Sequence, residues 1–354
     1  MKVLVTGGAG FIGGAVVRRL MRDGASVVNV DKLTYAATPE ALAEFDADPR
    51  YAFVQADIGD AAAMGAAFDR HRPEAVIHLA AESHVDRSID APETFIQTNV
   101  LGTYTILQAA LSYHEHQPAS ERAQFRFLHV STDEVFGALA PNASPFTETT
   151  PYAPRSPYAA SKAASDHLVK AWGETYGLPV VLTNCTNNYG PWQFPEKLIP
   201  LMIAKALDGQ SLPVYGAGDQ VRDWLHVDDH AAALCHILEH GRTGETYAIG
   251  ARAERRNIDV VRAICGLLDR RRPGPVPYAD RITYVADRPG HDRRYAIDPS
   301  KLERQLDWRP EWGFEAGLAA TVDWYLAHET WWRAIVAHSA TGNRQGMYQR
   351  RAAE

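Results

Sequence analysis

Cysteine is scarce in this sequence. The 354 residues contain three, Cys185, Cys235 and Cys265, which lie far apart and form no C-x-x-C pair. Three widely spaced thiols favour a reduced protein over a disulfide framework or a zinc site, so no metal is expected. Long hydrophobic runs are also missing, since no apolar stretch approaches the ~18 residues of a membrane span. Because Met1 leads directly into a strand-like segment, with no room for a signal peptide, we expect a cytoplasmic protein.

Positive charge is in deficit, and the formal net charge at pH 7 is −7. This balance argues against a polyanion such as nucleic acid as a partner. It leaves a small anionic ligand open, because such a ligand needs only a local cluster of Arg and Lys. Neither an internal repeat nor a Gly/Ser-rich linker divides the chain, which is long enough for one large or two interlocked domains. With 46% hydrophobic residues and a mean hydropathy of −0.28, the composition is that of an ordinary globular protein with no membrane partner.

A glycine-rich turn follows the first predicted strand. Residues 2–6 are apolar, and Gly7, Gly10 and Gly13 then lead into a helical pattern. Such glycines permit a tight bend and a close approach of the backbone to a pyrophosphate at a helix N-terminus. A Gly-rich turn alone is a weak signal, but its place between a strand and a helix predicts a dinucleotide site.

An acidic residue ends the second predicted strand. Residues 26–30 are followed by Asp31, at the distance from the glycines where an acid is expected to bind the ribose hydroxyls. The Asp31 carboxylate would repel a 2′-phosphate, which favours NAD over NADP. The adjacent Lys32 weakens this preference.

Strands and helices alternate through the first 130 residues. Strand-like runs at residues 51–56 and 75–80 are separated by helical stretches at residues 61–70 and 92–113. Alternation of this kind predicts an α/β fold with a doubly wound parallel Rossmann sheet.

The ends of these later strands are small or polar. Asp57 and Ile58 can wall an adenine, but Asp57 can equally be the N-cap of the next helix. Ala80 and Ala81 allow a ribose or nicotinamide to approach closely. These positions suit loops that line a ligand crevice at the carboxyl ends of parallel strands.

A phenol and an ammonium group lie one helical turn apart at Tyr158 and Lys162. A phenol with an unperturbed pKa near 10 is a poor base at pH 7, and a nearby Lys cation should lower that pKa. Thr132, just beyond an apolar run at residues 125–130, can relay the hydrogen bond to a reacting hydroxyl. Together with a dinucleotide fold, these residues indicate hydride transfer from a secondary alcohol; the alternative is a surface helix pair.

Two carboxylates, Asp133 and Glu134, are more than an alcohol oxidation needs. A 4-keto sugar has an acidified C5 proton, and its C6 hydroxyl can leave once it is protonated. One carboxylate as base and the other as acid would therefore turn oxidation into dehydration. The alternative is that Asp133 caps a helix or turn. Near another strand end, Asn187 and Asn188 are either turn formers or binding residues at the same sheet edge.

Nine segments, spanning the chain to about Trp332, resemble the NAD-dependent sugar epimerase/dehydratase family of extended short-chain dehydrogenases/reductases. They are TGGAGFIG (6–13), DKLTY (31–35), AAESHVDRSI (80–89), STDEV (131–135), SPYAASK (156–162), NNYGP (187–191), FPEKLIP (194–200), GDQVRDW (218–224) and RPGHDRRY (288–295). The nucleotide-fold segments occur superfamily-wide, whereas the Thr-Asp-Glu triplet and the two last blocks are more specific.

The resemblance implies 4,6-dehydration of dTDP-glucose to a 4-keto-6-deoxy sugar for deoxysugar biosynthesis. Tyr158, assisted by Thr132 and Lys162, would remove the C4 hydroxyl proton while the C4 hydride passes to NAD. Glu134 would take the C5 proton and Asp133 would protonate the departing C6 hydroxyl. The hydride would then return to C6, so NAD would stay tightly bound and be regenerated in each turnover.

The resemblance also implies two sets of binding residues. Those for NAD are Gly7, Gly10, Phe11, Ile12, Gly13, Asp31, Lys32, Leu33, Thr34, Asp57, Ile58, Leu79, Ala80, Ala81, Thr98, Tyr158, Lys162 and Asn188. Those for the sugar nucleotide are Ser83, Thr132, Asn187, Lys197, Leu198, Pro213, Tyr215, Arg222, Asn257, Asp287, Arg288 and His291.

The expected domains interlock. A Rossmann domain of residues 1–185, to which residues 221–255 return, is joined to a smaller C-terminal α/β substrate domain of residues 186–220 and 256–332. Residues 333–354 form a polar and basic tail beyond the clear resemblance. The resemblance also implies a homodimer, formed through the helices at residues 92–113 and 161–176.

One residue departs from the family pattern, and two other functions remain as alternatives. Phe136 stands where the family usually has Tyr, and we expect no change in the chemistry. A 4-epimerase or decarboxylase of the same superfamily would share Tyr158 and Lys162 but typically lacks the acidic pair. A non-catalytic NAD-binding sensor would need none of these residues.

Overall fold

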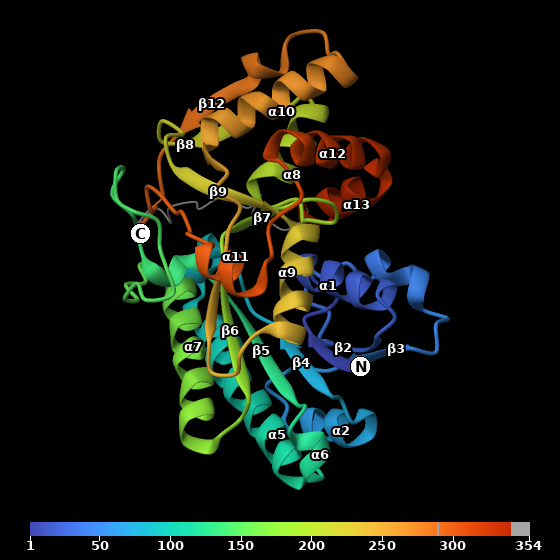
Figure 1. The fold of residues 1–354 in the computed structure, drawn as a ribbon. Helices are drawn as coiled ribbons and strands as arrows, with labels where there is room; N and C mark the ends of the chain where they lie inside the picture. The colour runs from blue at the N-terminus through green and yellow to red at the C-terminus, as the bar shows by residue number, and fades with distance from the viewer. Residues whose placement is uncertain (289, 341–354) are drawn as a thin grey trace, which may run out of the picture.

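The computed structural model describes residues 1–288 and 290–340. Within them, the central sheet has seven parallel strands in the order β10-β6-β5-β4-β1-β2-β3, which confirms the doubly wound fold (Figure 1). The strands are β1 (Lys2–Thr6), β2 (Ser26–Asp31), β3 (Tyr51–Gln55), β4 (Ala75–His78), β5 (Arg126–Thr132), β6 (Val180–Cys185) and β10 (Thr246–Ile249).

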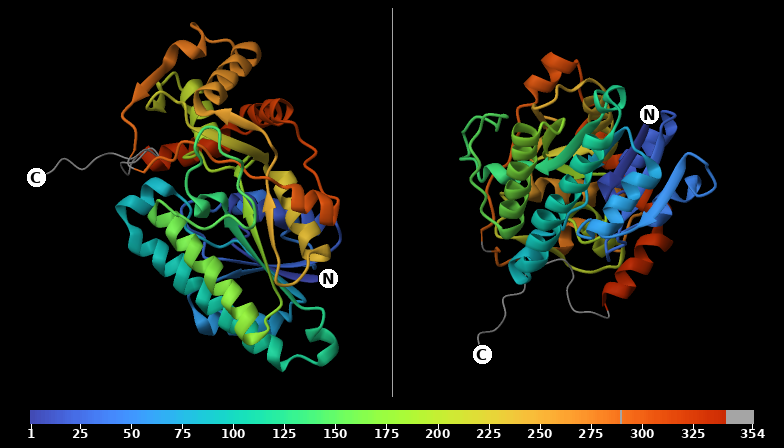
Figure 2. Two further views of the ribbon diagram at one scale, coloured as in Figure 1. Left: turned by 60° about the vertical axis from the view of Figure 1, so that its left-hand side comes forward. Right: turned by 90° about the horizontal axis from the view of Figure 1, so that it is seen from below.

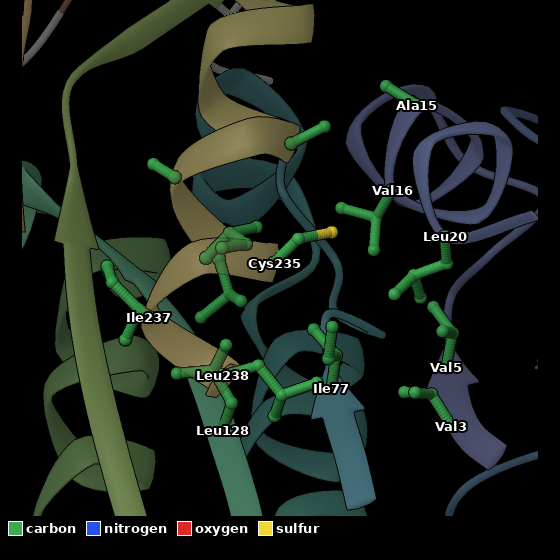
Figure 3. Packing of buried hydrophobic residues seen from close by; sticks show 14 of the residues in the cluster. Val3, Val5, Ala15, Val16, Leu20, Ile77, Leu128, Cys235, Ile237 and Leu238 are labelled. Carbon is green, nitrogen blue, oxygen red and sulfur yellow. The ribbon is translucent and has the colours of Figure 1, made fainter. Parts of the chain in front are cut away.

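Successive residues of β1 face opposite sides of the sheet, as a strand requires. Val3 and Val5 pack with helices α1 (Phe11–Arg22) and α9 (Val227–His240), and Figure 3 shows both valines beside Val16 and Leu20 of α1. Leu4 packs on the other side with α2 (Ala61–His71), α5 (Thr103–His116) and α7 (Pro157–Tyr176). Helices therefore cover both faces (Figure 2), and the central strands are buried along nearly their whole length instead of alternating between buried and exposed residues.

A smaller part gathers at one end of the molecule, at the top of Figure 1. It contains a sheet of order β11-β9-β7 and the parallel pair β8 and β12. Its strands are β7 (Asn187–Tyr189), β8 (Leu212–Tyr215), β9 (Val221–His226), β11 (Glu254–Arg256) and β12 (Ile282–Val285), and its helices are α8 (Leu198–Leu207), α10 (Asn257–Arg271), α12 (Phe314–Ala327) and α13 (Glu329–Ala340). These helices bury a second apolar core that includes Ile203, Ile264 and Trp332. Between β9 and β11 the chain returns to the large sheet through α9 and β10, so the two parts interlock.

The remaining elements are short. They are η1 (Pro39–Phe45), α3 (Val85–Asp90), α4 (Pro92–Phe95), η2 (Ile96–Gly102), α6 (Ala119–Arg122), η3 (Asp133–Phe136), η4 (Tyr278–Arg281) and α11 (Ser300–Leu306). Residues 92–113 are thus not one regular helix, because the π-helical turn η2 interrupts it. Ser131 and Thr132 belong to β5 itself rather than to a loop after residue 130.

The predicted tail begins inside α13, which continues past residue 333, and residues 341–354 lie outside the described residues. In the described part of the chain, no helix combines the length and apolar character needed to cross a membrane. Cys185, Cys235 and Cys265 are all buried and free.

Candidate active site

A cavity of about 320 Å³ lies at the carboxyl ends of the parallel strands. It brings together most of the residues predicted for the cofactor: Gly7, Gly10, Phe11, Ile12, Gly13, Asp31, Lys32, Thr34, Ile58, Leu79, Ala80, Ala81, Thr98, Tyr158, Lys162 and Asn188. Thr132, Asp133, Glu134, Ser83, Asn187 and Lys197 line it as well. The dinucleotide residues and the two carboxylates therefore share one cavity.

The glycine turn leaves no room for side chains. A Cβ on Gly13 would lie 2.0 Å from the Gly7 carbonyl oxygen, and a Cβ on Gly7 would lie 2.8 Å from Ala80 Cα. Gly7 also has a φ of +73°, in the left-handed region that favours glycine. Because no side chain caps α1 at Gly10, the first N–H groups of the helix remain available to a pyrophosphate. The turn therefore fits a dinucleotide.

The Asp31 carboxylate is held in place at the cavity wall. Its oxygens accept hydrogen bonds from the backbone N–H groups of Ala9 at 3.0 Å and Leu33 at 2.8 Å. The Lys32 ammonium lies 3.4 Å from both Asp57 Oδ2 and Thr98 Oγ1. This cation is thus already engaged by the Asp57 carboxylate, and the role of Asp31 in the preference for NAD stays a prediction.

Asp57 is not the N-cap of the following helix. It accepts the N–H of Gly59 at 2.8 Å and pairs with Lys32. Asp60 caps α2 instead, accepting from the N–H groups of Ala62 and Ala63. The alternative that sequence reasoning left open for Asp57 is therefore wrong, although neither Asp57 nor Leu33 lines the cavity.

The threonine and two carboxylates sit at the junction of β5 and η3. Thr132 Oγ1 accepts the N–H of Glu134 at 3.3 Å and lies 3.3 Å from Asp133 Oδ1, so the threonine, not Asp133, caps the turn. Asp133 is 2% exposed, and its Oδ2 has no hydrogen-bond partner within the described residues. Burial, together with the charge of Glu134, raises the pKa of Asp133 to about 8. Asp133 is therefore a protonated acid at neutral pH.

Tyr158 and Lys162 lie in the first turns of α7, which Ser156 caps by accepting the N–H of Ala159 at 3.0 Å. The Lys162 ammonium donates to the Val130 carbonyl at 2.9 Å. Burial lowers the pKa of Lys162. Burial and the negative charge of Glu134 raise the pKa of Tyr158 well above its usual value. The hydrogen bond with Thr132 acts to lower the pKa of Tyr158, but desolvation outweighs it, so the lowering of this pKa expected from Lys162 is not found.

A buried polar network behind β5 was not anticipated from the sequence. Asp166 accepts hydrogen bonds from Ser131 Oγ at 2.8 Å and Tyr152 OH at 2.9 Å, and it contacts His129 Nε2 at 3.1 Å. Asp166 is fully buried and follows Lys162 by one helical turn on α7. It therefore places a negative charge near the Lys162 ammonium group, and this i, i+4 spacing was the one available sequence signal.

The π-helical turn η2 supplies a second unexpected residue, Asn99. Its amide donates to Ser161 Oγ at 2.8 Å and to the Glu82 carbonyl at 3.0 Å, while its oxygen accepts the Glu82 N–H at 2.8 Å. Asn99 thus fixes the loop after β4 against α7. π-turns of this kind are frequent at functional sites.

The remaining predicted sugar-nucleotide residues do not line the cavity. Arg288 Nη1 donates to Asp86 Oδ1 at 2.5 Å, and Tyr215 OH donates to Asp86 Oδ2 at 3.1 Å. His291 Nδ1 lies 2.6 Å from Asp287 Oδ1. The others are Leu198 at the start of α8, Pro213 on β8, buried Arg222 on β9 and Asn257 at the start of α10.

Phe136 lies away from the cavity in a small apolar cluster. Its ring centroid is 5.1 Å from that of Phe146 and 5.3 Å from that of Tyr152. Phe136 therefore packs among aromatic rings, and the expectation that its missing hydroxyl leaves the chemistry unchanged stays a prediction.

Comparison with known proteins agrees with this geometry. The family described as GDP-mannose 4,6 dehydratase matches residues 4–321. The dTDP-glucose 4,6-dehydratase of Shigella flexneri is 59% identical over 94% of each chain, and that of Neisseria meningitidis is 57% identical over 98% of this chain and 99% of its own. The dTDP-glucose 4,6-dehydratase of Streptomyces venezuelae, solved with NAD and dTDP, has a TM-score of 0.86 and 45% identity, over 95% of this chain and 100% of its own.

A sugar-nucleotide epimerase is a more distant neighbour. The UDP-glucose 4-epimerase of Thermotoga maritima has a TM-score of 0.82 but is 29% identical, over 92% of this chain and 99% of its own. The fold is thus shared with epimerases, while the sequence is nearer to the dehydratases. The chain belongs to the dTDP-glucose 4,6-dehydratase family of NAD-dependent extended short-chain dehydrogenases/reductases.

Proposed function

We propose that this site converts dTDP-glucose to dTDP-4-keto-6-deoxyglucose for deoxysugar biosynthesis. The observation that carries the proposal is Asp133, a buried acid with a pKa of about 8 in the same cavity as Tyr158 and the dinucleotide turn. An oxidation alone would not need this acid. NAD, when bound, accepts a hydride from C4 of the sugar and returns it to C6.

The chain's own residues move the protons. Tyr158 takes the proton of the C4 hydroxyl in its phenolate form, and Thr132 shares its hydrogen bond. The positive charges of Lys162, held on the Val130 carbonyl, and of NAD, when bound, would favour this ionised form. The hydrogen bond from Thr132 favours the phenolate and so lowers the pKa of Tyr158 against the dominant effect of burial.

The two carboxylates have different roles in the elimination of water. Glu134 removes the C5 proton that the 4-keto group acidifies, and Asp133 gives its proton to the departing C6 hydroxyl. C5 is protonated again when the hydride returns to C6, so the net change is the loss of one water. Asp133 lines the cavity, its buried Oδ2 has no hydrogen-bond partner in the described part of the chain, and it is the acid we assign. Two neighbouring carboxyl groups with different environments can in this way hold different protonation states.

Positive charge for the diphosphate comes from Lys197, Arg222 and Arg288. Burial lowers the pKa of Arg222, which stacks on the Tyr295 ring at 4.4 Å. An arginine fork matches a phosphate better than a lysine does. We propose that the other residues predicted for the cofactor bind NAD, and that the other residues predicted for the sugar nucleotide bind the substrate.

We propose a homodimer formed through α5 and α7. Leu101 and Tyr104 are 47% and 44% exposed, and Tyr176 is 52% exposed. Trp172 links the two helices, with ring centroids 5.8 Å from Tyr104 and 5.3 Å from Tyr176. A second copy would cover this aromatic face. Light scattering of the wild type and of Leu101→Glu tests the proposed dimer. We expect the wild type to be a dimer and Leu101→Glu to be a monomer. A monomeric wild type would reject the proposal.

We also propose the domain limits given above and a cytoplasmic location. The return of β10 to the large sheet supports including residues 221–255 in the Rossmann domain. The three free thiols support a reducing compartment.

Incubation with dTDP-glucose tests the proposed reaction. We expect a 4-keto-6-deoxy product, detected by its sugar mass 18 units below that of the substrate, as loss of one water requires. Formation of the 4-epimer alone, or of no product by NAD-loaded protein, would reject the dehydratase function.

A further inference from the structure

We propose that Tyr35 and Glu196 form a clasp across the cofactor cleft that slows the release of NAD. The inference rests on the proposed function, because it takes the cavity to be the NAD site. The loop after β2 lines this cavity with Thr34 and Ala36, and we take this loop as one wall. The loop before α8 lines the same cavity with Phe194 and Glu196, and we take it as the second wall.

The clasp is a direct contact between these two walls. Tyr35 OH donates to Glu196 Oε1 at 2.9 Å, although the residues are 161 positions apart in the chain. The Tyr35 ring also meets the Phe194 ring edge to face, with centroids 5.5 Å apart. A hydrogen bond to a charged carboxylate is among the stronger contacts that a tyrosine can make.

A third segment holds both partners in place. The Arg87 guanidinium of α3 lies 3.6 Å from the centroid of the Tyr35 ring, a close cation–π contact. His84 Nε2 lies 3.8 Å from Glu196 Oε2, and the Glu196 side chain is 14% exposed. Next to it, Lys197 Nζ donates to the Ser83 carbonyl at 3.0 Å. The loop before α8 is therefore anchored, and Tyr35 closes onto a fixed acceptor.

The position of the clasp gives it a role in retention. A dinucleotide that reaches from Asp31 to Tyr158 lies between the two walls, since both residues line the same cavity. Its departure requires one wall to move, which breaks the hydrogen bond between Tyr35 and Glu196. In a reaction with no net redox change, the reduced cofactor must stay until the hydride has returned. A contact that slows dissociation serves this requirement without touching the reacting atoms.

The test measures release of NAD from the holoenzyme. Protein loaded with radiolabelled NAD is chased with excess unlabelled NAD, and the label that remains bound is followed with time. Tyr35→Phe removes the donor hydroxyl but keeps the ring, and we expect release to be about tenfold faster. Tyr113→Phe is the matched control, because Tyr113 OH donates to the Pro73 carbonyl at 3.2 Å and Pro73, unlike Glu196, does not line the cavity. Equal release rates for Tyr35→Phe, Tyr113→Phe and the wild type would overturn the clasp.

A double-mutant cycle identifies the partner. Glu196→Ala should release NAD faster by itself, and Tyr35→Phe should add nothing in that background. Additive effects of the two substitutions would overturn a direct clasp between these residues. If one variant failed to fold, the other would still give a release rate to compare with the wild type.

The clasp and the proposed reaction can fail separately. If the wild type forms the keto-deoxy product and Tyr35→Phe releases NAD no faster than the wild type, the proposed reaction stands and the clasp is rejected. If the wild type forms no product but Tyr35→Phe releases NAD tenfold faster, the proposed reaction is rejected and the clasp stands.

Discussion

The Arg288 guanidinium donates to the Asp86 carboxylate at 2.5 Å and so joins the C-terminal part of the protein to helix α3 beside the large sheet. The pair is largely buried, with side chains 19% and 6% exposed. Burial alone would raise the pKa of Asp86, but the Arg288 charge holds it below its usual value. The arginine is therefore paired with a carboxylate at the place where the substrate diphosphate is proposed to bind.

Replacement of this arginine should weaken substrate binding more than catalysis. For Arg288→Met we expect a KM for dTDP-glucose about 10- to 100-fold higher, since one or two charged hydrogen bonds are lost, with a smaller change in kcat. Steady-state kinetics measure both. Arg293→Met is the control, because the Arg293 side chain is 66% exposed and lies 3.6 Å from Asp219. An equal rise in KM for both variants would contradict the assignment.

Asp133→Asn should separate oxidation from dehydration. The amide keeps the shape of the side chain but cannot protonate the C6 hydroxyl, so elimination should slow about 100-fold or more, while C4 oxidation continues. Absorbance of NADH near 340 nm should then build up in a single turnover, which it does not in the wild type. Equal loss of both steps would argue against Asp133 as the acid. Glu134→Gln is a useful companion, since it blocks the same elimination from the base side.

The same group predicts a pH limit. Asp133 acts in its protonated form and has a pKa of about 8, so the single-turnover rate of dehydration should fall as pH rises above 8. We expect a decrease of about tenfold per pH unit, because each unit reduces the acid fraction tenfold. A rate that rose through this range would show that the ionised form is the active one.

Asp133 should also cost the protein stability at neutral pH. An unfolded Asp has a pKa near 3.9, whereas folded Asp133 holds its proton up to about pH 8. Stability contributed by this proton is present below pH 4 and is lost as pH rises towards 8, by about 1.4 kcal/mol per pH unit. Asp133→Asn should therefore gain free energy of unfolding relative to the wild type as pH rises from 5 to 7. Urea denaturation at both pH values measures it, and a constant difference would contradict burial of the neutral acid.

Two Gly→Ala substitutions should have opposite effects. A methyl group on Gly13 would lie 2.0 Å from the Gly7 carbonyl oxygen, so Gly13→Ala should disrupt the turn and the binding of NAD. A methyl group on Gly65 in α2 meets nothing within 4 Å, and Gly65→Ala should stabilise the protein by about 0.5–1 kcal/mol. Thermal unfolding with and without NAD compares them. Normal NAD affinity in Gly13→Ala would show that the turn is looser than the structure indicates.

Much of the fold could be predicted from patterns of residues that are close in sequence. The glycine turn, the acid at Asp31 and the helix spacing of Tyr158 and Lys162 each involve residues close in sequence, so their geometry could be predicted from it. The Asp133–Glu134 pair could be predicted as chemistry, because no simple oxidation needs it. Its elevated pKa could not, since that follows from burial by distant elements.

The features that could not be predicted from the sequence are contacts between residues that are far apart in the chain. Asp166 meets Ser131 and Tyr152 only after β5 and α7 have packed. Tyr35 and Glu196 come from opposite parts of the chain, and no periodicity links them. The π-turn at η2 was hidden because its side-chain pattern differs little from that of the α-helices on either side.

The return of β10 to the sheet has a consequence for solubility. All six residues of β6 (Val180–Cys185) are buried, and β10 pairs with the last four of them, from Leu182 to Cys185. A fragment that ended at residue 185 would present this apolar strand as a bare edge, which is a template for pairing between molecules. The short β10, four residues long, closes that edge from 61 positions downstream of Cys185. Truncated forms of this protein should therefore aggregate rather than persist as free Rossmann domains.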